Sequence, residues 1–191
     1  MKRALFAAAA VLLAGCGYNR IQTLDEQANA FKSQIEVQLQ RRADLVPNLV
    51  ETVRGYAQQE RDVFTAVTEA RAKATQTTLP PDILTNPEAF KQFQQNQAAL
   101  TGALSRLLAV SERYPDLKSS QNFLALQSQL EGTENRIAVA RRDYIGAVQR
   151  YNTNLRTIPG RWIAALLYPD AKIKETFTIA DAAQEAPKVK F

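Results

Sequence analysis

Residues 119–158 carry the longest uninterrupted helical pattern in the chain. No proline interrupts the run, and apolar side chains recur along it at steps of three and four residues. The seam consists of Phe123, Leu126, Leu130, Thr133, Ile137, Ala140, Tyr144, Val148, Tyr151, Leu155 and Ile158. At about 1.5 Å per residue such a helix is on the order of 55 to 60 Å long, and only other long helices can bury so narrow a seam. The run therefore predicts an all-α, elongated, up-and-down antiparallel bundle.

Composition agrees with helix and excludes several classes of function. The 191 residues are 46% hydrophobic and include only seven glycines. A formal net charge of +5 is too small to indicate a nucleic-acid partner. Histidine is absent, which removes the commonest general base at neutral pH and the commonest metal ligand. This excludes triad hydrolysis and histidine-containing metal sites. We also expect no enzyme, no metal site and no cofactor.

The first sixteen residues have the features of a bacterial lipoprotein signal. Lys2 and Arg3 precede an apolar stretch at residues 4–13, about half the length that a bilayer core requires. Leu13-Ala14-Gly15-Cys16 resembles a lipobox, and Cys16 is the only cysteine. The resemblance implies cleavage between Gly15 and Cys16, acyl chains such as palmitate on Cys16, and a chain attached to a membrane. The alternative is an ordinary secretory signal followed by an incidental buried cysteine.

Start and stop signals divide the rest of the chain. Thr23, with Glu26 three residues later, predicts the start of the first helix, and Pro47 predicts a kink or a restart. We expect a helix over residues 46–75 and a loop over residues 75–86.

A third helix is expected after that loop, capped by Asn86 before Pro87. Four of its glutamines are expected on a solvated face: Gln92, Gln94, Gln95 and Gln97.

Two motifs resemble the signature of the LemA family. The first comprises Arg41, Arg42, Asp44, Leu45, Val46, Pro47, Asn48, Leu49 and Val50, with Val53, Gly55, Tyr56, Glu60 and Ala70-Arg71-Ala72 behind it. The second comprises Tyr114-Pro115-Asp116-Leu117-Lys118, Phe123, Leu126, Leu130, Glu134, Ala140-Arg141-Arg142, Tyr151-Asn152 and Pro159. The chain departs from the family pattern twice, because a lipobox replaces the usual transmembrane helix and Tyr144-Ile145 stands where the family has Tyr-Asn.

The resemblance implies a four-helix bundle and a membrane-associated protein without established enzymatic activity. It also suggests partners among envelope proteins, in particular a membrane protease or a protein with a TPM domain. The oligomeric state stays open.

Polar residues beside the apolar seams form the candidate site. Arg41, Asp44 and Asn48 share a helix face by their spacing, and Glu131, Glu134 and Arg141 form a polar line on the long helix. One interpretation is a ligand site or partner groove. The other is a structural layer in which Arg41 or Arg42 pairs with Glu131 or Glu134, and Arg141 pairs with Asp44 or Glu51.

The end of the chain offers two further surfaces. Residues 161–168 form a short amphipathic segment that either caps the bundle or touches lipid headgroups. The last residues, with Val189 and Phe191, form either an ordinary tail or a segment that a peptide-binding domain captures.

We therefore divide the chain into a signal at residues 1–15, a lipidated tether at 16–22, a helical bundle at 23–168 and a partly extended, mobile tail at 169–191. The expected location is the bacterial cell envelope, facing the periplasm or the exterior. Gly17 after the cysteine, in place of Asp, favours the outer membrane.

Overall fold

The computed structural model describes residues 19–76 and 83–177, and these residues form helices and connecting segments without any β-strand. The helices are α2 (Arg20–Tyr56), α3 (Arg61–Gln76), α4 (Pro87–Val110), α5 (Pro115–Lys118), α6 (Gln121–Arg156) and α7 (Gly160–Leu167), with short 3-10 turns at Ile83–Thr85 and Ser111–Arg113. The predicted all-α class is confirmed.

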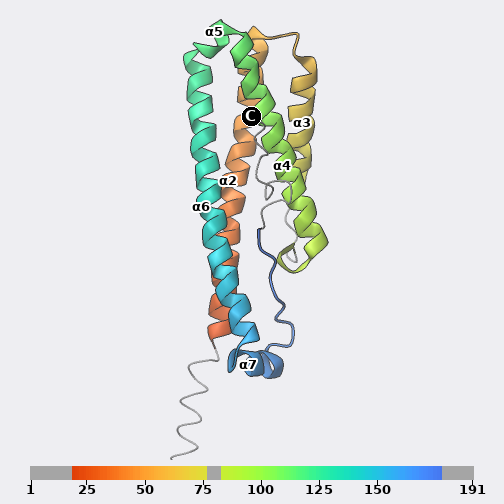
Figure 1. Cartoon of the computed structure of the whole chain (residues 1–191), viewed down its shortest axis with the longest axis vertical. Helices are drawn as coiled ribbons and strands as arrows, with labels where there is room; N and C mark the ends of the chain where they lie inside the picture. Colours follow the sequence, from red (N-terminus) through yellow and green to blue (C-terminus); the bar gives the residue numbers. More distant parts are fainter. Residues whose placement is uncertain (1–18, 77–82, 178–191) are drawn as a thin grey trace, which may run out of the picture.

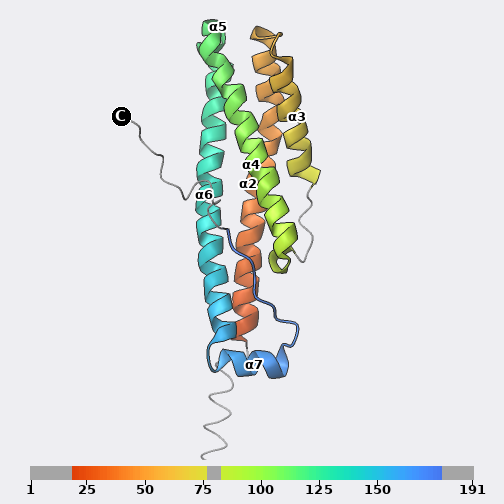
Figure 2. The same ribbon diagram turned by 45° about the vertical axis from the view of Figure 1, so that its right-hand side comes forward.

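The two longest helices, α2 and α6, run in opposite directions and pack against each other along their length (Figure 1). The shorter helices α3 and α4 pack on each other and cover one side of the α5 half of that pair. In the other half, residues 171–177 run beside α2 and α6, and α7 lies across the end of the pair (Figure 2). The molecule is therefore broad at the α5 end and narrow at the α7 end.

The seam predicted on α6 forms the core. Phe123, Leu130, Thr133, Ile137, Ala140, Tyr144, Val148 and Tyr151 are buried, and Leu126 and Leu155 are partly buried. Ile158 is 62% exposed, so its predicted place in the seam is wrong. The reason is that α6 ends at Arg156, before Pro159, and the chain then turns into α7.

The first helix differs from the prediction at its start, and of the two alternatives at Pro47 the structure does not contain the restart. It begins at Arg20, so residues 20–22 belong to the helix rather than to a tether, and the Thr23 hydroxyl donates back to the Asn19 carbonyl (2.8 Å). The helix continues through Pro47 instead of restarting there. Pro47 has no N–H to give the Ala43 carbonyl, and Arg71 Nε on α3 donates to that oxygen at 2.8 Å.

The helix predicted over residues 46–75 is broken in the structure after Tyr56. Ala57 to Glu60 form a turn, and α3 packs back against α2. Glu60 holds this turn, because its carboxylate accepts from Arg113 Nη2 (2.9 Å) and from the Tyr114 hydroxyl (3.1 Å). Periodicity missed the break since Val53, Ala57 and Phe64 are buried on both sides of it and so preserve the helical repeat.

The start of α4 is confirmed, because the Asn86 side chain accepts a hydrogen bond from the Ala89 N–H (3.2 Å) with Pro87 in the first turn. The expected solvated glutamine face is wrong at Gln97, which is buried. Gln97 lies four residues after Phe93 and three before Leu100, so it belongs to the apolar stripe that both of those residues occupy.

Residues 171–177 form a strap whose backbone is held by hydrogen bonds to side chains of α6 and to the turn at Ile83–Thr85. Asn152 on α6 donates to the Lys174 carbonyl (2.8 Å) and accepts from its N–H (2.9 Å). The Tyr144 hydroxyl donates to the Glu175 carbonyl (2.8 Å), and the Glu175 N–H donates to the Leu84 carbonyl (2.6 Å). The strap therefore covers α6 in the half of the molecule that α3 leaves open.

Side chains of the strap complete the core of that half. The Phe177 ring packs at 5.0 Å from the Phe90 ring centroid and at 5.5 Å from that of Tyr144. The buried Lys174 ammonium pairs with Asp25 on α2 (3.0 Å) and lies 5.2 Å from the centre of the Tyr151 ring. The strap thus contributes packing as well as hydrogen bonds.

Candidate functional site

The polar cluster is organised around Arg42, whose side chain is 1% exposed on the inner face of α2. Its Nη1 donates to Glu134 Oε1 on α6 (2.8 Å) and to Thr101 Oγ1 on α4 (3.1 Å), and its Nη2 donates to Gln97 Oε1. Gln97 Nε2 in turn donates to the Ala74 carbonyl of α3 (3.2 Å). One guanidinium and one amide therefore connect all four of the longer helices.

Arg141 lies on α6 at the edge of this cluster. Burial lowers its pKa, the Arg42 charge lowers it further, and Glu134 opposes both effects. Its guanidinium carbon lies 5.0 Å from the centre of the Phe177 ring, so the strap supplies an aromatic face for the charge. Arg141 therefore couples the polar cluster to the strap.

The structure separates the residues that the sequence grouped together. Arg42, Glu134 and Arg141 come together inside the molecule, whereas four of the candidates lie on the outer faces of their helices: Arg41, Asp44, Asn48 and Glu131. Asp44 accepts a hydrogen bond from Gln40, and Glu131 accepts one from Gln127, each four residues away on its own helix. Cys16, Gly15, Val189 and Phe191 lie outside the described residues.

Among the alternative ion pairs, the structure contains the one between Arg42 and Glu134. The expected partner Glu51 pairs instead with Arg54 on its own helix (2.7 Å). Gln97 and Thr101 were missed because neither is charged, yet the place of Gln97 on the apolar stripe of α4 was a usable signal. The sequence placed Arg71 only within a family motif. Its role depends on the Ala43 carbonyl, which has no N–H partner at Pro47.

Two buried tyrosines on α6 complete the site's electrostatics. Burial raises the pKa of Tyr144, and the charge of Glu175 adds to the rise. Burial, followed by the charge and hydrogen bonding of Asp25, raises the pKa of Tyr151 to about 12. Both phenols are therefore neutral at physiological pH, where they serve as hydrogen-bond donors.

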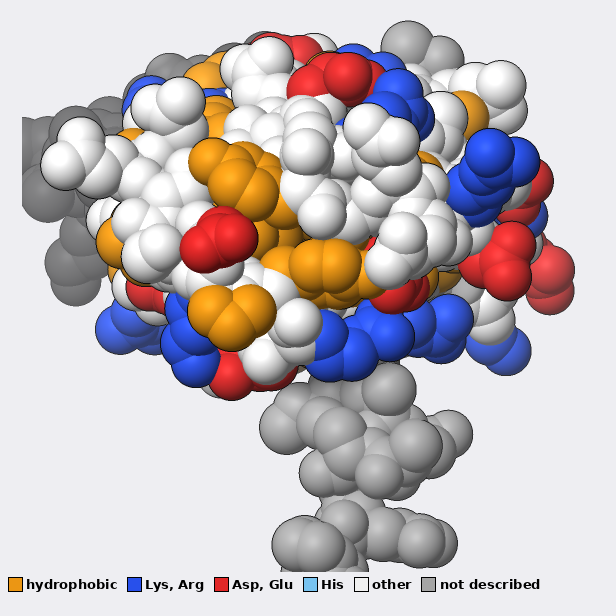
Figure 3. All heavy atoms as spheres, turned by 90° about the horizontal axis from the view of Figure 1, so that it is seen from above, with side chains coloured by type: hydrophobic (Ala, Val, Ile, Leu, Met, Phe, Trp, Pro, Cys, Tyr) orange, Lys and Arg blue, Asp and Glu red, His pale blue; other side chains and the backbone are white. Residues whose placement is uncertain are grey.

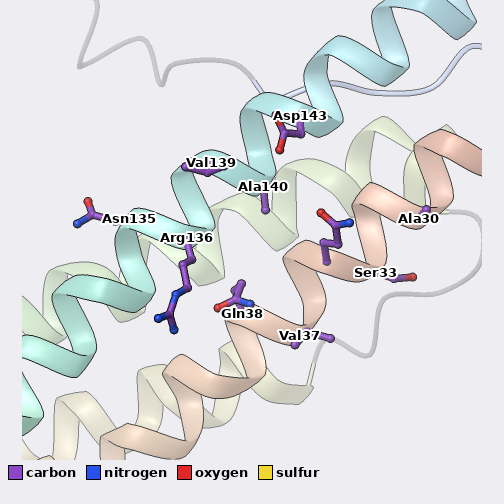
Figure 4. Close-up of a pocket in the computed structure, with 10 residues that line it drawn as sticks. Ala30, Ser33, Val37, Gln38, Asn135, Arg136, Val139, Ala140 and Asp143 are labelled. Carbon is purple, nitrogen blue, oxygen red and sulfur yellow. The ribbon is translucent and has the colours of Figure 1, made fainter.

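A groove of about 550 Å³ runs between α2 and α6, with α4 behind the helix pair (Figure 4). Its walls are Ala30, Ser33, Gln34, Val37 and Gln38 from α2, and Asn135, Arg136, Val139, Ala140 and Asp143 from α6. Val37 is 63% exposed and Val139 is 47% exposed, so apolar side chains face solvent on both walls. No motif in the sequence indicated this groove.

Within residues 19–76 and 83–177, no group of three or more acidic or cysteine side chains is placed to hold a metal ion. No helix in the same residues combines the length and the apolar character needed to cross a bilayer.

The fold and the buried cluster make this an all-α protein in which the Arg42 guanidinium links the long helices from inside. The family model for the LemA family matches residues 31–191, and the chain belongs to the LemA family.

Two curated relatives give the degree of similarity. The chain is 29% identical over 166 residues to magnetosome protein MamQ 2 of Paramagnetospirillum magneticum, covering 77% of this chain and 60% of the relative. It is 26% identical over 165 residues to magnetosome protein MamQ of Magnetospirillum gryphiswaldense, covering 78% of this chain and 61% of the relative. The chain therefore spans about three fifths of the length of these relatives.

Proposed function

We propose that this LemA-family protein is a lipid-anchored component of the bacterial cell envelope that acts as a non-enzymatic scaffold for other envelope proteins. In this proposal acyl chains on Cys16 hold it at the membrane, with the outer membrane favoured by Gly17. The helices α2, α3, α4 and α6 then serve as the four-helix scaffold expected from the family. Family membership and the MamQ relatives support membrane association of a bacterial protein.

The observation that carries the scaffold role is the groove between α2 and α6. Its walls are antiparallel helices with small residues such as Ala30 and Ala140 and with exposed valines. This shape and lining suit the apolar ridge of an amphipathic helix from another protein. Arg136 and Asp143, both on the α6 wall, provide charges of opposite sign that can fix the direction of such a helix.

The alternative is a small-ligand binder or an enzyme that uses the polar cluster. Such a site needs polar groups that converge on space open to a ligand. Both terminal nitrogens of Arg42 are already occupied by Glu134, Thr101 and Gln97. We therefore favour a structural role for the cluster and place partner binding on the outer surface.

The anchor is tested by changing Cys16→Ser and fractionating the cells. We expect the variant to leave the membrane fraction for the soluble fraction, because the chain loses its acyl attachment. A variant that stays with the membrane in full would contradict attachment through this cysteine.

The scaffold role is tested with a photoreactive amino acid placed at Val37 in the groove, followed by crosslinking in intact envelopes and mass spectrometry. The matched control carries the same group at Leu124, an exposed apolar position on α6 outside the groove. We expect a discrete adduct with an envelope protein from position 37 alone, weakened by Val139→Glu across the groove. A membrane protease and a TPM-domain protein are the first partners to look for. Identical adducts from both positions would contradict a partner site in the groove.

A further inference from the structure

The helix α7 exposes apolar side chains on the face turned away from the bundle. Trp162 is 64% exposed and Leu166 is 81% exposed, and their four-residue spacing places them on one side of the helix. Ile158 just before α7 is 62% exposed. Large apolar residues gathered in this way indicate a contact surface rather than a solvated face.

The opposite face of α7 holds the helix in place. Ile163 and Ala164 pack against a cluster that contains Ile21 and Leu24 of α2 and Tyr151 of α6. The helix therefore lies across the end of the α2 and α6 pair (Figures 1 and 2). Trp162 and Leu166 are exposed on its other side.

The same end of the molecule is where the chain enters α2. The cysteine of the lipobox lies three residues before Asn19, and three residues span at most about 11 Å. A lipid on Cys16 would therefore hold the start of α2 close to the bilayer surface. Since Ile163 and Ala164 of α7 pack against the cluster that contains Ile21 and Leu24, the outer face of α7 would then meet that surface.

Charge agrees with this orientation. Exposed basic side chains at this end are Arg20, Arg156, Arg161 and Lys172, and the exposed acidic side chains nearby are Glu26 and Asp170. The basic excess suits anionic headgroups, and tryptophan is favoured at the boundary between headgroups and acyl chains.

The other end of the molecule differs in degree. Its large exposed apolar side chains, Leu124 (49%) and Tyr56 (46%), are less exposed than Trp162 and Leu166. Ion pairs lie there between Arg113 and Glu60 (2.9 Å) and between Lys118 and Glu112 (2.7 Å). Seen from this end, hydrophobic side chains lie among acidic and basic ones (Figure 3).

We propose that the outer face of α7, with Trp162 and Leu166, lies in the interfacial layer of an anionic bilayer and orients the bundle on the membrane. The inference rests on the proposed attachment at Cys16. An eight-residue helix binds a bilayer weakly by itself, and a tether of a few residues provides the high effective concentration that makes the contact persistent. Attachment and docking are thus separate properties and can be tested separately.

Trp162 is the only tryptophan and Cys16 the only cysteine, which makes a direct test possible. The chain from Cys16 onward, which keeps every helix described above, is coupled through Cys16 to maleimide-bearing lipids in vesicles of phosphatidylglycerol and phosphatidylethanolamine. We expect Trp162 emission to move to shorter wavelength than in solution and to be quenched by lipids brominated in the acyl chain. Emission that stays at its solution wavelength, without bromolipid quenching, overturns the proposal.

Two matched variants sharpen the test. Leu166→Glu should return the emission and quenching toward their solution values, whereas Leu124→Glu, an exposed apolar position at the other end of α6, should leave the shift intact. Circular dichroism verifies that both variants keep their helix content. Equal effects of the two variants overturn the proposal. A blue shift that appears without vesicles when the protein concentration is raised also overturns it, because the face then binds a second copy of the chain. Because coupling attaches the chain chemically, these results do not depend on lipidation in cells, which the Cys16→Ser fractionation tests.

Discussion

Arg42 is the residue on which the interior of the molecule depends most. A buried guanidinium is costly unless its donors are paired. Three side chains from α4 and α6 accept from the two terminal nitrogens of Arg42, whereas its buried Nε has no hydrogen-bond partner. The spacing of Arg42 and Glu134 within the family motifs made their pairing one of the expected alternatives. The roles of Gln97 and Thr101 required the positions of the helices, because an uncharged side chain in an apolar stripe does not reveal its partner.

Arg42→Ala should lower the free energy of unfolding by roughly 2 to 4 kcal/mol, because Gln97 stays buried without its partner and Glu134 loses its counter-charge. The estimate is below the full cost of breaking a buried pair since the Glu134 side chain is 37% exposed. Urea denaturation followed by circular dichroism measures the change. The neighbouring exposed Arg41→Ala is the control and should change stability by no more than about 0.5 kcal/mol. Equal effects at the two positions would contradict the central place of Arg42.

Two glycines should respond to alanine in opposite directions. A Cβ at Gly160 would lie 2.2 Å from the Asn154 carbonyl oxygen, so Gly160→Ala should destabilise the junction of α6 and α7 by about 1 to 3 kcal/mol. A Cβ at Gly102 meets nothing within 4 Å, so Gly102→Ala should stabilise α4 by about 1 kcal/mol. Thermal unfolding of the two variants beside the parent chain tests both signs, and a stabilised Gly160→Ala would show that the close approach is misplaced.

At the scale of elements, the sequence predicted α6 and the start of α4 well. The apolar seam is sufficient to locate α6, and the Asn86-Pro87 cap is sufficient to locate the start of α4. It failed where two helices share a phase across a turn, as at Ala57 to Glu60, and where a proline is accommodated by a distant side chain, as Arg71 accommodates Pro47. The sequence predicted the strap only as part of a partly extended, mobile tail at residues 169–191, whereas residues 171–177 are bonded to the helices. The position of the strap depends on Asn152, whose side chain forms hydrogen bonds with backbone atoms of Lys174 and not with its side chain.

Asn152→Ala should release the strap without unfolding the helices. The variant loses two hydrogen bonds to Lys174, which together contribute about 1 to 3 kcal/mol to the local closing of the strap. Hydrogen exchange should therefore become faster at the Lys174 and Glu175 amides and remain unchanged in the middle of α2 and α6. Asn135→Ala, at an exposed asparagine of α6, is the control. Unchanged exchange at Lys174 and Glu175 would mean that other contacts are sufficient to hold the strap.

At the scale of the whole molecule, the two ends of the bundle expose different kinds of side chain. The helices α3 and α4 cover one side of the α2 and α6 pair. The α7 end combines the entry of the chain into α2 with strongly exposed Trp162 and Leu166, and the α5 end carries the ion pairs of Arg113 with Glu60 and of Lys118 with Glu112. The side of the α2 and α6 pair away from α4 carries the groove with Val37 and Val139. In the proposed arrangement the bundle stands on a bilayer, attached at Cys16, and presents this groove to partners above the surface.

The most direct measurement of this account is the intact mass of the protein extracted from cell membranes with detergent. Attachment at Cys16 predicts a chain that begins at Cys16 and carries the added mass of a diacylglyceryl group, with or without a third acyl chain. A mass that corresponds to a chain with an unmodified Cys16 would contradict the anchor and, with it, the orientation proposed for the molecule.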